Sequence, residues 1–301
     1  MKKKVILGGG VAGLIYAFYN KEYFVISPEF GGQMINQFPL GPRFLHMNEF
    51  SEKLLRGLEM PIEDIEVKTG YMLDSGVILD QIPHEQFKED YFMKSRGKKD
   101  LAGYDKTVMS EGKNRFVALK VDFNEMIGLL CHKLNGRLIT GKVERIDTRA
   151  RTLIVDDKII EYESLVNTIP LNVFGRLVTP GTFPSPDNFK SEAVTYILLQ
   201  PELASNFDYV YVADPRKVFH RLTFDPKGTI AEWFGVHDAK ECQKVFGERY
   251  VDSKVLYGAQ IIPYLGEIKL EGVKFIGRYG TWKREWKTEK VIEEAIKDGK
   301  L

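Results

Sequence analysis

Three glycines near the N-terminus constrain the fold of this chain more than any other feature. A short apolar run leads directly into Gly8, Gly10 and Gly13, which match the pattern G-x-G-x-x-G. A helix-compatible run at residues 14–19 and a strand-like run at residues 23–26 follow. In such a unit the first glycine permits a tight turn, the second lets backbone approach a pyrophosphate, and the third permits close packing of helix on strand. The order of elements predicts a dinucleotide-binding unit rather than a purely structural glycine turn.

The second strand of such a unit normally ends in an acid that binds a ribose, about twenty residues beyond the glycines. Here the strand runs into Ser27, Pro28 and Glu29. Ser27 occupies the usual position by strand alignment, whereas Glu29 is the only carboxylate within reach. Both residues are therefore candidate ribose contacts.

Composition excludes several other classes of protein. Of 301 residues, 44% are hydrophobic and 28% charged, which fits a packed globular protein and not a disordered or collagenous one. The formal net charge of +1 gives no global reason to expect nucleic acid or an anionic membrane as a partner. Cys131 and Cys242 lie far apart and no histidine cluster has metal-ligand spacing, so we expect a reducing compartment and no metal site.

The N-terminus admits a second interpretation, because three lysines followed by apolar residues 5–19 imitate a secretory signal. The glycines within that run, the lack of a small-x-small cleavage site and the strand that follows argue against it. We therefore expect a cytoplasmic protein that does not associate with membranes.

Further motifs carry a resemblance to a known family. A double glycine, Gly31 and Gly32 followed by Gln33, combines with the first glycine motif to resemble the FAD-binding start of the flavin amine oxidase and protoporphyrinogen oxidase superfamily. Residues 41–46, GPRFLH, are similar to the flavin-facing segment of UDP-galactopyranose mutases and their relatives. Residues 164–170 resemble the strand that returns to the FAD domain in that group.

The C-terminal part of the chain resembles the same group. Residues 275–282 and 286–292 are similar to its final strand, flavin-facing loop and last helix. The resemblance implies a non-covalently bound FAD. The cofactor-binding residues expected from the motifs are Gly8, Gly10, Val11, Ala12, Gly13, Ser27, Glu29, Gly31, Gly32, Gln33, Arg43, Val143, Gly277, Arg278 and Trp282.

The expected fold class is α/β, with a Rossmann-type FAD-binding domain of the glutathione-reductase kind interleaved with a smaller α+β substrate domain. Flavin-type segments recur at residues 1–50, 115–175 and 265–301, and the substrate domain fills residues 51–114 and 176–264. Apolar residues at helical spacing predict a helix at 123–134. Short strands are predicted after it, at 137–140, 142–147, 152–156, 158–162 and 165–169. Alternating patterns at 194–199, 209–213, 218–224 and 230–235 predict an antiparallel sheet that roofs the flavin.

Two side chains are candidates for catalysis. His46 lies in the segment that resembles the flavin-facing loop, where an imidazole can stabilise negative charge or hold an anionic substrate group. Arg278 follows the last strand, and its guanidinium can meet a pyrophosphate or an anionic substrate. The alternatives are a structural histidine and a surface salt bridge. On another strand, His220 and Arg221 are adjacent and should point to opposite faces, so that only one of them can face the flavin.

The preferred function is an FAD-dependent oxidation of a small amine-bearing or nucleotide-linked molecule, by hydride transfer to flavin N5. One alternative is a UDP-galactopyranose mutase-like isomerase that uses reduced flavin without net redox change. Another is a phage-type flavoenzyme of nucleobase or DNA modification that acts on an amino group attached to a base. A flavin-binding protein without catalysis remains a further alternative, and substrate, electron acceptor and oligomeric state stay open.

Overall fold

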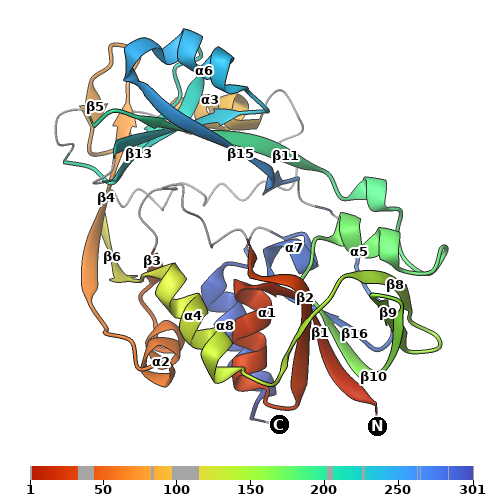
Figure 1. The fold of residues 1–301 in the computed structure, drawn as a ribbon. Coiled ribbons are helices and arrows are strands. Elements are labelled where there is room, and N and C mark those ends of the chain that lie inside the picture. Colours follow the sequence, from red (N-terminus) through yellow and green to blue (C-terminus); the bar gives the residue numbers. More distant parts are fainter. Residues whose placement is uncertain are drawn as a thin grey trace.

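The computed structural model describes residues 2–32, 44–82, 85–96, 115–201, 206–225, 228–262, 264, 266–283 and 285–300. Within them the chain forms two sheets with a helical layer beside each (Figure 1). Gln33 and Arg43 lie outside the described residues.

The first sheet contains a parallel core and an antiparallel extension. Its seven strands are β1 (Lys3–Gly10), β2 (Tyr23–Gly31), β7 (Leu138–Thr140), β8 (Val143–Asp147), β9 (Thr152–Val155), β10 (Lys158–Asn167) and β16 (Val273–Phe275). Strands β7, β2, β1, β10 and β16 are parallel neighbours, whereas β8, β9 and the start of β10 form an antiparallel meander. We expected two strands at residues 158–162 and 165–169, but β10 is one continuous strand. Its start belongs to the antiparallel meander and its end to the parallel core.

Helices cover one face of this sheet, and the meander lies on the other side (Figure 1). The covering helices are α1 (Val11–Tyr19), α4 (Phe123–Lys133) and α8 (Thr288–Asp298). Their apolar faces bury Leu14, Ile127 and Ile292 in one core with Ile6 of β1. Asp122 caps α4 by accepting from the backbone N–H groups of its first turn, which fixes where this helix begins.

The second sheet is almost entirely antiparallel. Its nine strands are β3 (Phe44–His46), β4 (Asp64–Met72), β5 (Ile78–Leu79), β6 (Arg115–Lys120), β11 (Ser191–Leu199), β12 (Tyr209–Val212), β13 (Phe219–Asp225), β14 (Gly228–Phe234) and β15 (Tyr250–Ile261). Only β12 and β4 pair in parallel. We expected β11 to β14 from their alternating pattern, but β4 and the 12-residue β15 were missed.

The remaining helices are α2 (Glu49–Gly57), α3 (Glu85–Arg96), α5 (Leu171–Leu177), α6 (Ala239–Phe246) and α7 (Gly277–Thr281), with short 3₁₀ turns at Pro186–Asn188 and Gly247–Arg249. Helix α6 lies on the side of the second sheet that faces away from the first (Figure 1). A buried cluster of Leu171, Phe189, Ile261 and Trp282 joins the two sheets, because it takes side chains from α5, from the end of β15 and from the end of α7.

Strands β3 and β6 pair with each other in the second sheet. The expected boundaries, 1–50 and 115–175, assign both strands to the FAD-binding part. The division of the chain into two domains stays a prediction.

Candidate cofactor and substrate site

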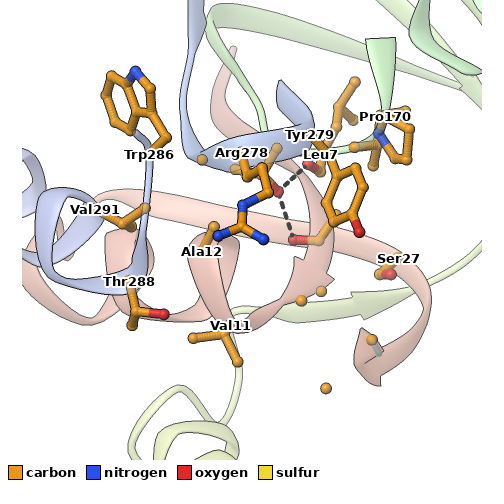
Figure 2. Close-up of a pocket in the computed structure, with 18 of the residues that line it drawn as sticks. Leu7, Val11, Ala12, Ser27, Pro170, Arg278, Tyr279, Trp286, Thr288 and Val291 are labelled. Carbon is orange, nitrogen blue, oxygen red and sulfur yellow. Dashed lines mark hydrogen bonds between the residues drawn. The ribbon is translucent and has the colours of Figure 1, made fainter. Parts of the chain in front are cut away.

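A cavity of about 790 Å³ lies between the two sheets, at the ends of β1 and β2. The first sheet contributes the glycine turn and the start of α1, and the second contributes Phe44, Tyr196 and Leu256. Arg278 and Tyr279 of α7 border the same cavity as Val11 and Ala12 (Figure 2). Its size falls within the range of roughly 300–1,000 Å³ that small-molecule and cofactor sites occupy.

The three motif glycines have three different surroundings. A Cβ on Gly8, whose φ is +107°, would lie 2.5 Å from Thr168 Oγ1, and a Cβ on Gly13 would lie 2.0 Å from the carbonyl oxygen of Gly8. These two glycines are required by the chain itself, for the turn and for the packing of helix on strand. A Cβ on Gly10 would meet nothing within 4 Å. The space beside Gly10 therefore belongs to the cavity, where a bound group can approach the backbone.

The N-terminus of α1 opens into the cavity. Gly10 is its N-cap and provides no side-chain hydrogen bond, and the first turn holds no acidic residue. Val11 and Ala12 of that turn line the cavity. Uncapped N–H groups and the helix dipole make this end suited to an anion such as a pyrophosphate.

Ser27 and Glu29 both line the cavity, because β2 bulges beside the turn. Leu7 pairs with Ile26 and Gly9 pairs with Phe30, so three residues of β2 lie opposite the single residue Gly8. Ser27 is buried, and its carbonyl oxygen accepts from the backbone N–H of Gly141 at 3.0 Å. Glu29 is exposed, which leaves its carboxylate available to a ligand.

His46 sits in the wall of the cavity with two charged residues from the start of α8. Its backbone N–H donates to Glu289 Oε1 at 2.7 Å, and its Nε2 lies 3.4 Å from Lys287 Nζ. Burial lowers the pKa of His46, and the Lys287 ammonium lowers it further, while Glu289 acts in the opposite direction. The imidazole of His46 is therefore neutral at pH 7.

Sequence reasoning missed three residues of this wall, namely Trp286, Lys287 and Glu289. They fall in a segment whose resemblance to the flavin-facing part of the family was noted. The residue types gave no signal, since a Lys and a Glu are common at the start of any helix.

Arg278 lines the cavity and is exposed, and it has no ion pair within the described part of the chain. Its placement depends on Gly277, whose φ is +79° and whose Cβ, if present, would lie 2.9 Å from the Cβ of Ala12. Glycine at that position brings α7 against the first turn of α1. The surface salt bridge considered as an alternative for Arg278 is not seen among the described residues.

The structure brings most of the expected residues together. Those that line the cavity are Gly8, Gly10, Val11, Ala12, Ser27, Glu29, Gly31, Gly32, His46, Val143, Gly277 and Arg278. Gly13 lies behind the turn, and Trp282 is 1% exposed within the cluster that joins the sheets. Trp282 ends α7, and Trp286 precedes α8.

The expectation that His220 and Arg221 point to opposite faces was wrong. The register of β13 against β14 shifts between Phe219 and Arg221, and this bulge turns both side chains toward Glu232. Side chains alternate strictly between the two faces of a sheet only where the hydrogen-bonded pairing of the strands is regular.

None of the helices in the described part of the chain is long and apolar enough to cross a membrane. Within that part, no three His, Cys, Asp or Glu side chains gather as a metal site would require.

No protein-family model and no curated protein matches this chain. Solved structures match it over nearly its whole length. A reduced UDP-galactopyranose mutase has a TM-score of 0.68 at 14% identity, over 99% of this chain and 95% of its own. A CLA-producing fatty acid isomerase from P. acnes has a TM-score of 0.65 at 12% identity, over 98% and 97%. A putrescine oxidase bound to putrescine has a TM-score of 0.63 at 12% identity, over 100% and 98%.

These structures define the class of fold. The chain shares the mixed α/β fold of these solved structures, including a Rossmann-type unit, so the expected fold class is confirmed.

Proposed function

We propose that the chain is a flavin-dependent enzyme that binds FAD non-covalently in this cavity and oxidises a small amine-bearing or nucleotide-linked molecule by two electrons. The observation that carries the proposal is the open space beside Gly10, at the uncapped start of α1. Open space beside the backbone and free N–H groups at a helix start together suit the pyrophosphate of a dinucleotide. The fold likeness to a putrescine oxidase supports the choice of an amine.

The other lining residues fit the rest of such a cofactor. The N–H groups of α1 bind the pyrophosphate, and Glu29 accepts from a ribose hydroxyl in the bulge of β2. Ser27 is the alternative ribose contact. Of the described residues that line the cavity, none is a cysteine, which supports binding without a cysteinyl link.

When bound, FAD supplies the acceptor for a hydride. The second sheet excludes water from its side of the cavity, since its residues Tyr196, Leu256 and Ala259 form an apolar wall there. Lys287 lines the cavity beside His46, and its positive charge disfavours an ammonium and favours the neutral amine, whose carbon next to nitrogen can lose a hydride. Neutral His46 holds Lys287 in place through its Nε2 lone pair.

A mutase-like isomerisation on a nucleotide sugar is the second candidate. The fold likeness to a UDP-galactopyranose mutase and the similarity of residues 41–46 to that group favour it. Modification of an amino group on a nucleobase is a third hypothesis, and the same test covers it.

Anaerobic stopped-flow mixing separates these reactions. The oxidised enzyme is mixed with amines, amino-acid derivatives and aminomethylated nucleosides, and the dithionite-reduced enzyme with UDP-sugars. We expect an amine to bleach the flavin absorbance of the oxidised enzyme. Turnover of a UDP-sugar by the reduced enzyme alone, with no bleaching by any amine, would contradict the oxidase proposal.

A further inference from the structure

A buried charge cluster lies outside the lining of the cavity, at the bulge between β13 and β14. Arg221 donates through Nε and Nη2 to one oxygen of Glu232, with the Nε contact at 2.8 Å. The other oxygen of Glu232 lies 3.6 Å from His220 Nε2. The side chains of His220 and Arg221 thus both contact the carboxylate of Glu232.

The cluster keeps its charges and has one open side. Burial alone would raise the pKa of Glu232, but Arg221 and His220 outweigh burial and lower that pKa to about 2. Burial lowers the pKa of His220, which is therefore neutral at pH 7. The side chains of Glu232 and His220 are each 3% exposed, whereas that of Arg221 is 31% exposed. A guanidinium has five N–H donors, of which Glu232 takes two; the side chain of Tyr211 is hydrogen-bonded to the same guanidinium.

Ring contacts connect this open side to the cavity. The guanidinium of Arg221 lies over the ring of Tyr209, 5.5 Å from its centroid, and the ring of Tyr209 lies 6.1 Å from that of Phe44. Phe44 lines the cavity. Tyr196, which also lines it, stands directly opposite Glu232 in the register of β11 and β14. The cluster therefore lies on the cavity-facing side of the second sheet, two ring contacts from the lining.

The exposed edge of the guanidinium is not needed for the ion pair, because Nε and Nη2 already bind Glu232. An arginine locked by a buried carboxylate and left open on one edge is suited instead to bidentate recognition of an oxyanion. Glu232 fixes the orientation of the Arg221 guanidinium, and the ring of Tyr209 packs against the face of that guanidinium.

We propose that Arg221 anchors the substrate by an oxyanion, a carboxylate or a phosphate, at the end of the molecule away from the reacting amine. Arg221 is then a specificity-determining residue, and Glu232 is a positioning residue that acts through it. This inference rests on the proposed function for the identity of the reacting end, but anion binding at Arg221 is measured without turnover.

The test is calorimetric titration of the purified chain with glutarate and, separately, with inorganic pyrophosphate. Because pyrophosphate can also bind at the start of α1, the oxyanion is identified by the anion whose binding to the wild type depends on Arg221. We expect Arg221→Lys to weaken that binding at least about tenfold, because a lysine cannot form the bidentate fork. Arg216→Gln, which removes an exposed arginine paired with Asp214, is the matched control and should bind as the wild type does.

If Arg221→Lys fails to fold, the double variant Arg221→Met, Glu232→Leu removes both charges with similar volume and should also lose the binding. Absence of binding to the wild type at 20 mM of either anion, or unchanged binding in a folded Arg221 variant, would overturn the proposal. Binding that depends on Arg221 in an enzyme that no amine reduces would leave the anion site standing and overturn the proposed reaction instead.

Discussion

At the scale of single residues, one glycine of the turn is required for folding and another leaves space for a ligand. Gly13 is enclosed by backbone, whereas a Cβ on Gly10 would meet no atom within 4 Å. Glycine is thus needed at Gly13 for packing and at Gly10 for ligand binding, and substitutions at the two positions can separate these roles.

We predict opposite effects for Gly10→Ala and Gly13→Ala. Gly10 has φ −73°, which any residue adopts, so its alanine variant should fold with stability within about 1 kcal/mol of the wild type yet bind FAD at least about tenfold more weakly. Gly13→Ala should lose roughly 1–3 kcal/mol of stability without ligand, since its Cβ would strike the Gly8 carbonyl. Thermal unfolding of the apoproteins and FAD titration measure both effects. A Gly10→Ala variant with wild-type FAD affinity would show that the cofactor does not approach this turn.

Glu29 offers a test of the ribose contact. Glu29→Gln should weaken FAD binding by roughly 1–3 kcal/mol, the range of a hydrogen bond to a charged group. Stability should not change, because the side chain is exposed. Ser27→Ala is the comparison, and a loss confined to that variant would assign the ribose to Ser27.

Glu232 makes stability depend on pH in a predictable direction. Its folded pKa of about 2 lies below the unfolded value of 4.5, so its contribution is complete above pH 4.5 and is lost as pH falls from 4.5 toward 2. The size is on the order of 3 kcal/mol. Urea unfolding at a series of pH values should show this component in the wild type and not in the double variant Arg221→Met, Glu232→Leu. Equal acid sensitivity of the two proteins would contradict the pairing.

At the scale of elements, irregular pairing places the site residues. The bulge in β2 brings Ser27 and Glu29 to one cavity, and the bulge in β13 brings His220 and Arg221 to one carboxylate. The N-terminal turn of α8 meets β3 through Glu289 and Lys287. These contacts join segments that are distant in sequence.

The elements with strong local signals could be predicted from the sequence. Glycine spacing gave β1, α1 and β2, and period-2 alternation gave β11 to β14. Strand β15 was missed because Asp252, Ser253 and Lys254 interrupt its apolar pattern. The bulge at His220 could not be foreseen, since a register shift depends on the partner strand. Lys287 and Glu289 gave no signal for the same reason, because only the fold brings them to His46.

We predict that Lys287→Gln raises the pKa of His46. The ammonium is one of two causes that lower this pKa, and burial, the larger cause, remains in the variant. Because a depressed histidine pKa makes folding weaken as pH falls below 6.5, the variant should also lose less stability between pH 6.5 and 5. Imidazole NMR titration measures the pKa directly. Lys290→Gln, which removes a nearby lysine of α8 that contacts Trp286, is the control. An unchanged pKa of His46 in Lys287→Gln would mean that the two side chains do not interact in solution.

At the scale of the whole molecule, the cavity exists because the two sheets face each other. Its lining takes the glycine turn from one sheet and Phe44, Tyr196 and Leu256 from the other. The buried cluster around Trp282 joins the same two sheets. A ligand that fills the cavity should therefore stabilise both parts together, by about 2.7 kcal/mol when its concentration is 100 times its Kd.

The most direct test of FAD binding is the chromophore of the purified chain after reconstitution. The flavin absorbance per chain should correspond to about one FAD, the unfolding temperature should rise with added FAD, and heat denaturation should release the cofactor intact. The Gly10→Ala variant, treated in the same way, should retain much less. Binding of FMN or NAD in place of FAD, or no chromophore after reconstitution of a folded chain, would contradict the proposal.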